Sequence, residues 1–180
     1  MAGIYIHIPF CKQACHYCNF HFSTSLVLQN DFLDALLKEA ALQKNYVEGE
    51  QVNTVYFGGG TPSLLKETDL HSIMESVHAH YNLSENVEIT LEANPDDINI
   101  QNLGIWKKNG VNRLSIGVQS FFEEDLKWMN RAHTAIQADA CIRLAQDADI
   151  KNMTIDLIYG SPGLTDSKWQ ENMQRASDLG

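Results

Sequence analysis

Three of the four cysteines in this 180-residue chain fall in one short run, FCKQACHYCNF at residues 10–20. Cys11, Cys15 and Cys18 have the spacing C-x3-C-x2-C, which lets a looped backbone aim three thiolates at one centre. Thiolates are soft ligands that favour zinc or iron–sulfur clusters. The spacing therefore predicts a metal site, and the odd number of thiolates indicates a site left open for another ligand.

The spacing alone leaves three interpretations open. In the first, which it favours, the three cysteines bind three irons of a 4Fe–4S cluster and the fourth iron is free for a substrate. In the second, His21 completes a Cys3His zinc site. In the third, the thiols only pack or form a redox pair. The remaining cysteine, Cys141, lies in a predicted helix with Leu144 and Ala145, where we expect a small buried side chain.

A second candidate binding segment is the run Gly58-Gly59-Gly60-Thr61-Pro62. As a phosphate loop it is weak, because no Gly-Lys-Ser/Thr follows and Pro62 lacks the backbone N–H that such a loop donates. Glycines without Cβ atoms do allow a ligand to approach the backbone closely. A tight turn between a strand and a helix explains the triplet equally well.

The bulk composition excludes some classes of protein. A net charge of −10 argues against non-specific nucleic-acid binding, since no basic excess is present to neutralise phosphates. The first residues lack the basic segment of a signal peptide, and His7 and Pro9 interrupt their apolar run. No stretch reaches the roughly 20 apolar residues of a membrane helix. We therefore expect a cytoplasmic protein, in which clustered cysteines bind metal or do redox chemistry more often than they form disulfides.

The elements that position these residues alternate along the chain. Short β-rich runs are expected at residues 4–8, 52–57, 87–91, 114–118 and 153–159. Helical periodicity is found at residues 33–41, 70–77, 98–108 and from Thr165 onwards. Capping-box spacing at Ser120-x-x-Glu123 and Thr134-x-x-Gln137 predicts two more helix starts. The alternation predicts an α/β fold with a parallel sheet, either doubly wound or a (β/α) barrel.

Parallel strands bring their carboxyl ends to one edge of the sheet, where ligands bind in both of these folds. The first two predicted strands run into the cysteine loop and the glycine triplet, and Glu92, Gln119 and Asp156 lie at the ends of the others. Arg131, between two predicted helices, has the bidentate geometry that binds carboxylates. Taken singly, each of these four polar side chains is equally explained as a solvated or ion-paired surface group.

Together, these motifs resemble the radical S-adenosylmethionine (SAM) superfamily. Cys11-x3-Cys15-x2-Cys18 with Tyr17 matches its cluster signature, and the GGGTP segment is similar to its glycine-rich motif. The resemblance implies a partial TIM-type (β/α) barrel. The repeat stops at Gly180 without a further strand, so we expect one incomplete radical SAM core domain over residues 1–180, with about five strands and truncated before closure.

The resemblance also implies cofactors. Cys11, Cys15 and Cys18 would ligate a 4Fe–4S cluster, and a reductant such as a flavodoxin or ferredoxin would supply the electron that cleaves SAM to methionine and a 5′-deoxyadenosyl radical. Family positions that contact SAM fall on Tyr5, Tyr17, Gly59, Gly60, Thr61, Glu92, Gln119, Arg131 and Asp156.

Within the superfamily, the motifs YIHIPFC, EANP, GVQS and IDLIYG resemble a branch that holds HemW-type heme chaperones and oxygen-independent coproporphyrinogen III oxidases. The oxidases carry one more cysteine two residues after the last cluster ligand, where this chain has Phe20, and they extend further before the first strand. Both differences favour a chaperone that binds heme and delivers it to apoproteins. The alternatives are the oxidase, an enzyme, and a zinc-stabilised α/β module without radical chemistry.

Overall fold

The computed structural model describes residues 2–180, and its central element is a five-stranded parallel sheet in the order β1-β2-β3-β4-β5. The strands are β1 Ala2–Ile8, β2 Val52–Gly59, β3 Leu83–Ala93, β4 Arg113–Gln119 and β5 Met153–Leu157. The helices are α1 Gln29–Leu42, α2 Glu67–His80, α3 Ile100–Lys108, α4 Glu123–Trp128, α5 Ala135–Asp147 and α6 Asp166–Asp178. Two 3-10 turns follow β2 and β3, namely η1 Pro62–Leu64 and η2 Pro95–Asp97.

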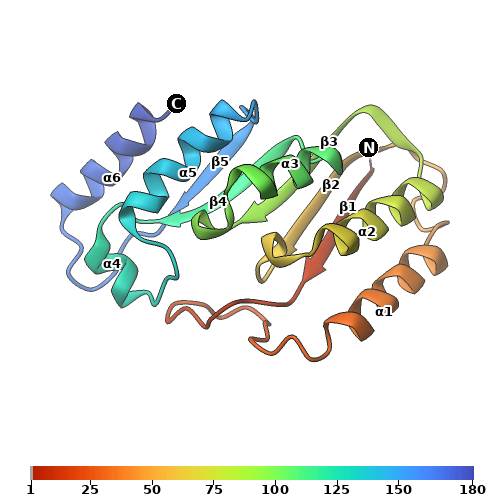
Figure 1. Ribbon diagram of the computed structural model, residues 1–180, viewed down its shortest axis with the longest axis horizontal. Coiled ribbons are helices and arrows are strands. Elements are labelled where there is room, and N and C mark those ends of the chain that lie inside the picture. The colour runs from red at the N-terminus through yellow and green to blue at the C-terminus, as the bar shows by residue number, and fades with distance from the viewer. Residues whose placement is uncertain (1) are drawn as a thin grey trace.

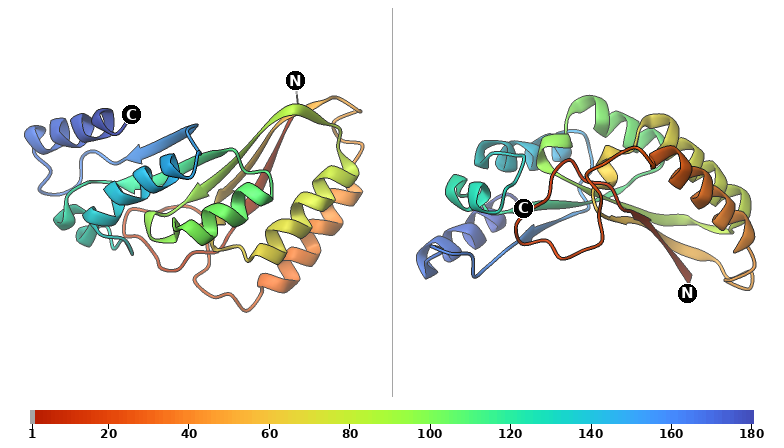
Figure 2. Two further views of the ribbon diagram at one scale, coloured as in Figure 1. Left: turned by 45° about the horizontal axis from the view of Figure 1, so that its top comes forward. Right: turned by 90° about the horizontal axis from the view of Figure 1, so that it is seen from below.

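The strand order separates the two folds that periodicity left open. Each strand pairs with the next one in sequence, so the order never reverses as it does in a doubly wound sheet. Helices α1, α2, α3 and α5 lie on one side of the sheet (Figures 1 and 2). Within residues 2–180 the sheet stays open, because β1 and β5 each pair along one edge only. The predicted partial barrel of about five strands is confirmed.

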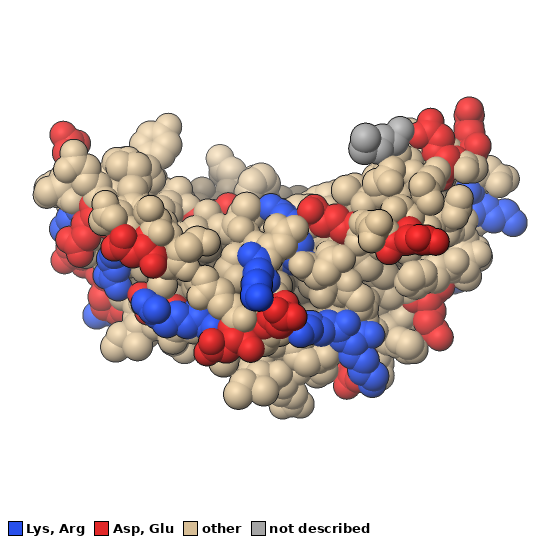
Figure 3. All heavy atoms as spheres, turned by 90° about the horizontal axis from the view of Figure 1, so that it is seen from above, with Lys and Arg blue, Asp and Glu red and all other residues tan. Residues whose placement is uncertain are grey.

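The two faces of the sheet differ in chemistry because side chains alternate along each strand. In β4, Leu114, Ile116 and Val118 are buried toward the helices. Ser115 and Gly117 point to the opposite face, which is hollowed along its length (Figure 3). The sheet therefore has a polar concave face and an aliphatic face that packs against the helices.

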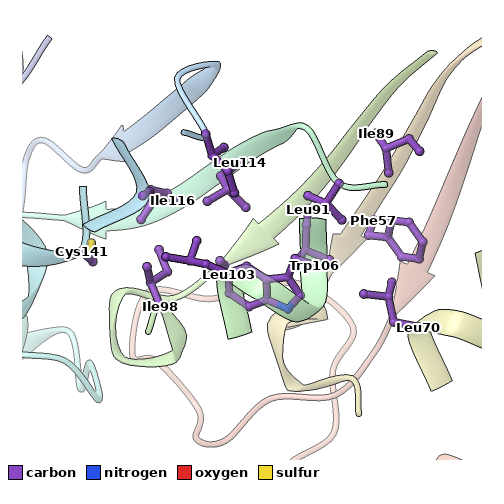
Figure 4. Close-up of a cluster of buried hydrophobic side chains, with 14 of the residues drawn as sticks. Phe57, Leu70, Ile89, Leu91, Ile98, Leu103, Trp106, Leu114, Ile116 and Cys141 are labelled. Atoms are coloured by element: carbon purple, nitrogen blue, oxygen red, sulfur yellow. The ribbon is translucent and has the colours of Figure 1, made fainter. Parts of the chain in front are cut away.

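The core fills the space between the sheet and its helices. Phe57 and Leu91 from the sheet pack with Leu70 of α2 and with Leu103 and Trp106 of α3 (Figure 4). All five side chains are at most 2% exposed, and burial of a residue of this size contributes roughly 1.5–3 kcal/mol.

Cys141 joins the same core from α5, near Ile116 and Ile98 (Figure 4). It is 3% exposed, and its thiol donates to the carbonyl of Ala138 at 3.2 Å. Burial raises its pKa to about 12. The prediction of a small buried residue is confirmed, and this thiol is separate from the other three.

The sequence predicts capping boxes at the starts of α4 and α5. Thr134 caps α5 with a complete capping box, since its hydroxyl accepts from the Gln137 amide and the Gln137 side chain accepts from the Thr134 amide. The helix predicted after Ser120 is present, but it begins only at Glu123 and has no side-chain cap, so the capping box predicted at Ser120 is wrong. The Ser120 hydroxyl instead donates to nearby buried Asp125 at 2.8 Å and accepts a tertiary hydrogen bond from the Asn172 side chain at 3.3 Å.

The predicted last strand also ends earlier than expected, at Leu157 rather than at Tyr159. Tyr159 is 78% exposed and contacts Trp169 of α6. Thr165 caps α6 as predicted, with its hydroxyl accepting from the Lys168 amide. Among residues 2–180, no helix is both long and apolar enough to cross a membrane.

Candidate functional site

A cavity of about 360 Å³ lies at the carboxyl ends of the strands, on the concave face. It gathers every residue predicted for the site except Tyr5. Those lining it are Cys11, Cys15, Tyr17, Cys18, Gly59, Gly60, Thr61, Glu92, Gln119, Arg131 and Asp156. Residues up to 145 positions apart in the sequence thus meet in one place, as the topology predicts for a sheet of parallel strands.

The cysteine loop is closed at its base by the protein itself. Phe10 and Ser23 form a parallel bridge, with the Cys11 amide donating to Ser23 at 3.0 Å and the Ser23 amide donating to Pro9 at 2.7 Å. A tighter turn inside the loop joins the Cys18 amide to the Cys15 carbonyl at 3.2 Å. These backbone bonds hold all three thiols, which are free and half-buried, on the cavity wall.

The arrangement of the thiols does not match a single-ion site. Within residues 2–180, no three His, Cys, Asp or Glu side chains are grouped to hold one metal ion. His21, the fourth ligand of the zinc interpretation, is exposed and is not among the cavity-lining residues. A cluster needs a looser arrangement, because each thiolate binds a different iron.

The glycine segment is joined directly to the end of β1. The Gly60 amide donates to Ile8 and the Thr61 amide donates to Phe10, each at 2.7 Å. A Cβ atom on Gly60 would lie 2.7 Å from the Phe10 carbonyl oxygen. Glycine is therefore required here for close backbone approach, and the segment ends beside Cys11.

Thr61 also acts on Cys11 directly. Burial raises the pKa of the Cys11 thiol, and the hydrogen bond with Thr61 opposes that rise. Arg131 opposes it too, through its positive charge. A half-buried thiolate at this position needs compensating positive charge, which a bound metal supplies.

Glu92 reaches the cavity from the end of β3 and is held at both oxygens. Its Oε1 accepts from the Tyr56 hydroxyl at 2.9 Å and its Oε2 accepts from the Gly59 amide at 3.1 Å. Burial raises the pKa of Glu92, and Asp156 adds to the rise. Burial and the Glu92 contact raise the pKa of Tyr56 to about 12, so it stays a neutral donor.

Arg131 crosses the cavity from the segment between α4 and α5. It donates to Asn94 Oδ1 at 2.7 Å, to the Gly117 carbonyl at 2.8 Å and to the Tyr17 hydroxyl at 3.2 Å. A longer contact of 3.5 Å reaches Cys15 Sγ. Its Nε is buried and has no hydrogen-bond partner among residues 2–180.

Gln119 and Asp156 lie on the two strands farthest from the cysteine loop. Gln119 adopts a positive φ of 67° at the end of β4, and its carbonyl accepts from the Ile158 amide. Asp156 is exposed on the open side of the cavity, where partial desolvation raises its pKa and Arg113 opposes that rise. A carboxyl group and an amide therefore line the cavity on this side.

Tyr5 lies outside the cavity. Its ring stacks on Tyr56 with centroids 5.9 Å apart, and it is 59% exposed on the concave face. Burial and the charge of Glu92 raise the pKa of Tyr5, and Tyr56 lies between the two side chains. A direct contact between Tyr5 and a ligand in the cavity remains a prediction.

Several lining residues were missed at the sequence level. Lys12 lines the cavity and pairs with Asp96 and Asp97 of η2, which ties the cysteine loop to the end of β3. Tyr56 does not line the cavity but donates to Glu92, and the strand pattern alone places it only within β2. Strand alternation could have found it, since it shares a face with Gly58 and pairs with Thr90, two residues before Glu92.

The residues present fit a 4Fe–4S cluster with SAM. Three thiols on one wall, a glycine edge closed to any Cβ, an orphaned buried guanidinium nitrogen and two carboxyl groups surround one cavity. Soft ligands for iron thus lie beside hydrogen-bonding groups suited to an amino acid and a ribose.

Comparison with known proteins agrees with this chemistry. The family model of the Radical SAM superfamily matches residues 5–176. The chain is 36% identical over 179 residues to the heme chaperone HemW of Escherichia coli (strain K12), covering 98% of this chain and 47% of that protein. It is 35% identical over 182 residues to HemW of Bacillus subtilis (strain 168), covering 99% and 48%.

Among solved structures, coproporphyrinogen III oxidase (HemN) from Escherichia coli, described as a radical SAM enzyme, matches with a TM-score of 0.90 at 29% identity, covering 99% of this chain and 42% of that one. The chain spans about half the length of the curated relatives that it matches. Membership of the family implies SAM and a 4Fe–4S cluster. The chain belongs to the radical SAM superfamily.

Proposed function

We propose that this chain is the radical SAM core of a heme chaperone of the HemW type. The observation that supports it most directly is the convergence of Cys11, Cys15 and Cys18 with the glycine segment and Glu92 in one cavity. Several similar proteins in this branch carry the name heme chaperone HemW. In this proposal the whole protein binds heme and delivers it to apoproteins.

The residues take separate roles in it. Cys11, Cys15 and Cys18 hold the cluster, which when bound supplies the electron for reductive cleavage of SAM. Gly59, Gly60 and Thr61 present backbone amides and carbonyls to SAM. The remaining contacts come from Tyr5, Tyr17, Glu92, Gln119, Arg131 and Asp156. A flavodoxin or ferredoxin is the proposed source of the electron.

Anaerobic reconstitution with iron and sulfide tests the cluster. We expect the wild-type chain to bind about four irons and to gain broad brown absorbance. Cys18→Ala removes a ligand and lowers iron binding sharply. Cys141→Ala is the matched control, because that thiol is buried in the core. Equal iron binding by the wild type and Cys18→Ala contradicts the assignment.

The second candidate is an oxygen-independent coproporphyrinogen III oxidase, favoured by the TM-score of 0.90 to HemN. Phe20 argues against it, since it stands where the resemblance places a further cysteine in the oxidases. Phe20 lines the cavity and is 75% exposed.

Two assays on the reconstituted protein separate the candidates. Formation of protoporphyrinogen IX from coproporphyrinogen III at catalytic rates would identify the oxidase. Stable heme binding followed by transfer to an apoprotein, without such turnover, supports the chaperone.

A further inference from the structure

The cysteine loop rests on a segment that lies far away in the sequence, residues 128–131 at the C-terminal end of α4. Asn130 makes a reciprocal pair with it: the Asn130 side-chain amide donates to the Ala14 carbonyl at 2.8 Å, and the Gln13 side-chain amide donates to the Asn130 carbonyl at 2.5 Å. Both bonds fall between Cys11 and Cys15. The loop therefore has a protein-made support that does not involve its thiols.

A second pair of contacts involves His16. Its amide donates to the Met129 carbonyl at 3.0 Å, and its Nδ1 lies 2.7 Å from the Trp128 carbonyl oxygen, to which it donates. Met129 is fully buried, so the supporting segment is anchored in the core. Both sides of Cys15 are thus fixed to one rigid segment.

The backbone of Asn130 connects this support to the cavity. Asn130 adopts a left-handed conformation with φ of 56°, which asparagine tolerates better than most residues. The turn follows directly on α4, with the Arg131 amide donating back to Leu126 at 2.9 Å. The next side chain, Arg131, then reaches across to Tyr17 and Cys15.

We propose that Asn130 is a positioning residue that couples the cysteine loop to Arg131. Its side-chain amide holds the loop while its left-handed backbone aims the guanidinium into the cavity, so cluster ligands and arginine keep a fixed relative position. The part that concerns SAM and the cluster rests on the proposed function. The part that concerns the loop stands on the hydrogen bonds alone.

Asn130→Gly is the informative variant, because glycine keeps the positive φ and loses only the amide. Asp149→Gly is its matched control, since Asp149 has a similar φ of 63° and is exposed after α5. In the chain without cofactors, the hydrogen-exchange rate of the His16 backbone amide measures how firmly the cysteine loop is held on residues 128–131. In the reconstituted chain, the SAM dissociation constant and the rate of iron loss to a chelator report the site.

We expect His16 to exchange about 2- to 10-fold faster in Asn130→Gly, the range that one lost hydrogen bond gives. SAM should bind more weakly by a similar factor and iron should leave faster, while the midpoint of thermal unfolding stays within the range of Asp149→Gly. A His16 exchange rate and SAM affinity equal to those of the control would overturn the proposal. Failure of the wild type to bind iron would instead contradict the proposed function and leave the exchange result intact.

Discussion

The hydroxyl of Tyr56 donates a 2.9 Å hydrogen bond to Oε1 of Glu92, linking the middle of β2 to the end of β3. The other oxygen of Glu92 is fixed by the Gly59 amide. The carboxylate therefore faces the cavity in one orientation although it is the end of a flexible side chain. Tyr56 in turn stacks on Tyr5, which extends the same chain of contacts to β1.

Tyr56→Phe removes this donor and keeps the ring. Because the Tyr56 hydrogen bond lowers the pKa of Glu92, its loss raises that pKa and frees the carboxylate to rotate. We expect SAM affinity to fall about 2- to 10-fold, the equivalent of roughly 0.5–1.5 kcal/mol. Anaerobic titration calorimetry of the reconstituted chain measures it. Tyr46→Phe, at a residue 82% exposed, serves as control, and an unchanged affinity in Tyr56→Phe would contradict the role of the hydroxyl.

Gly60→Ala should destabilise the chain by about 1–3 kcal/mol, because the new Cβ meets backbone that cannot move independently. It would lie 2.7 Å from the Phe10 carbonyl oxygen and 2.9 Å from that of Ile8. Gly104→Ala is the opposite case, since nothing lies within 4 Å of that Cβ in α3. It should stabilise the chain by up to about 1 kcal/mol. Urea unfolding of both variants checks the contrast, and similar effects at the two glycines would show that the backbone at Gly60 can adjust.

The burial of His133 leads us to expect a lower free energy of unfolding in mild acid. Its Nε2 donates to the Val118 carbonyl at 3.0 Å, and its Nδ1 is buried with no hydrogen-bond partner among residues 2–180. Burial, helped by the charge of Arg131, lowers its pKa to about 4, although Asp96 and Glu123 oppose the shift. The unfolded chain then takes up a proton near pH 6.5 and the folded chain does not.

His133 therefore costs almost no stability above pH 6.5, and the free energy of unfolding falls as the pH drops from 6.5 toward 4. Between pH 7.5 and pH 5 this one group removes about 2 kcal/mol of the free energy of unfolding. His133→Gln keeps a donor for Val118 but cannot be charged, so its stability should depend less on pH. Urea unfolding at the two pH values measures the difference. His78→Gln, on the exposed side of α2, should leave the wild-type dependence unchanged.

The local parts of this fold could be predicted because they depend on neighbours in sequence. The four buried residues of α2, at Leu70, Ile73, Met74 and Val77, have the spacing of one helix face. The edge of the sheet that holds the cavity could be predicted from topology, because parallel strands joined by crossover helices have all their carboxyl ends on one edge. This explains why cavity residues could be named before their contacts were known.

The contacts themselves could not be predicted in the same way. Lys12 pairs with Asp96 across 84 residues and Asn130 bonds Ala14 across 116 residues, and periodicity carries no signal at such separations. At Ser120 a local sequence pattern predicts a contact that the fold does not form. Its spacing matches a capping box, yet the side chain of Asn172 in α6, 52 residues away, donates a buried hydrogen bond to it that the local pattern does not contain.

The support beneath the cysteine loop has a consequence for the order of events during synthesis. Cys18 leaves the ribosome about 110 residues before Trp128, the first residue of the segment on which the loop rests. At ordinary translation speeds that interval is on the order of ten seconds. During it, three thiols on a nascent chain have no fixed geometry and are open to oxidation. We therefore expect stable cluster insertion to follow the synthesis of Arg131.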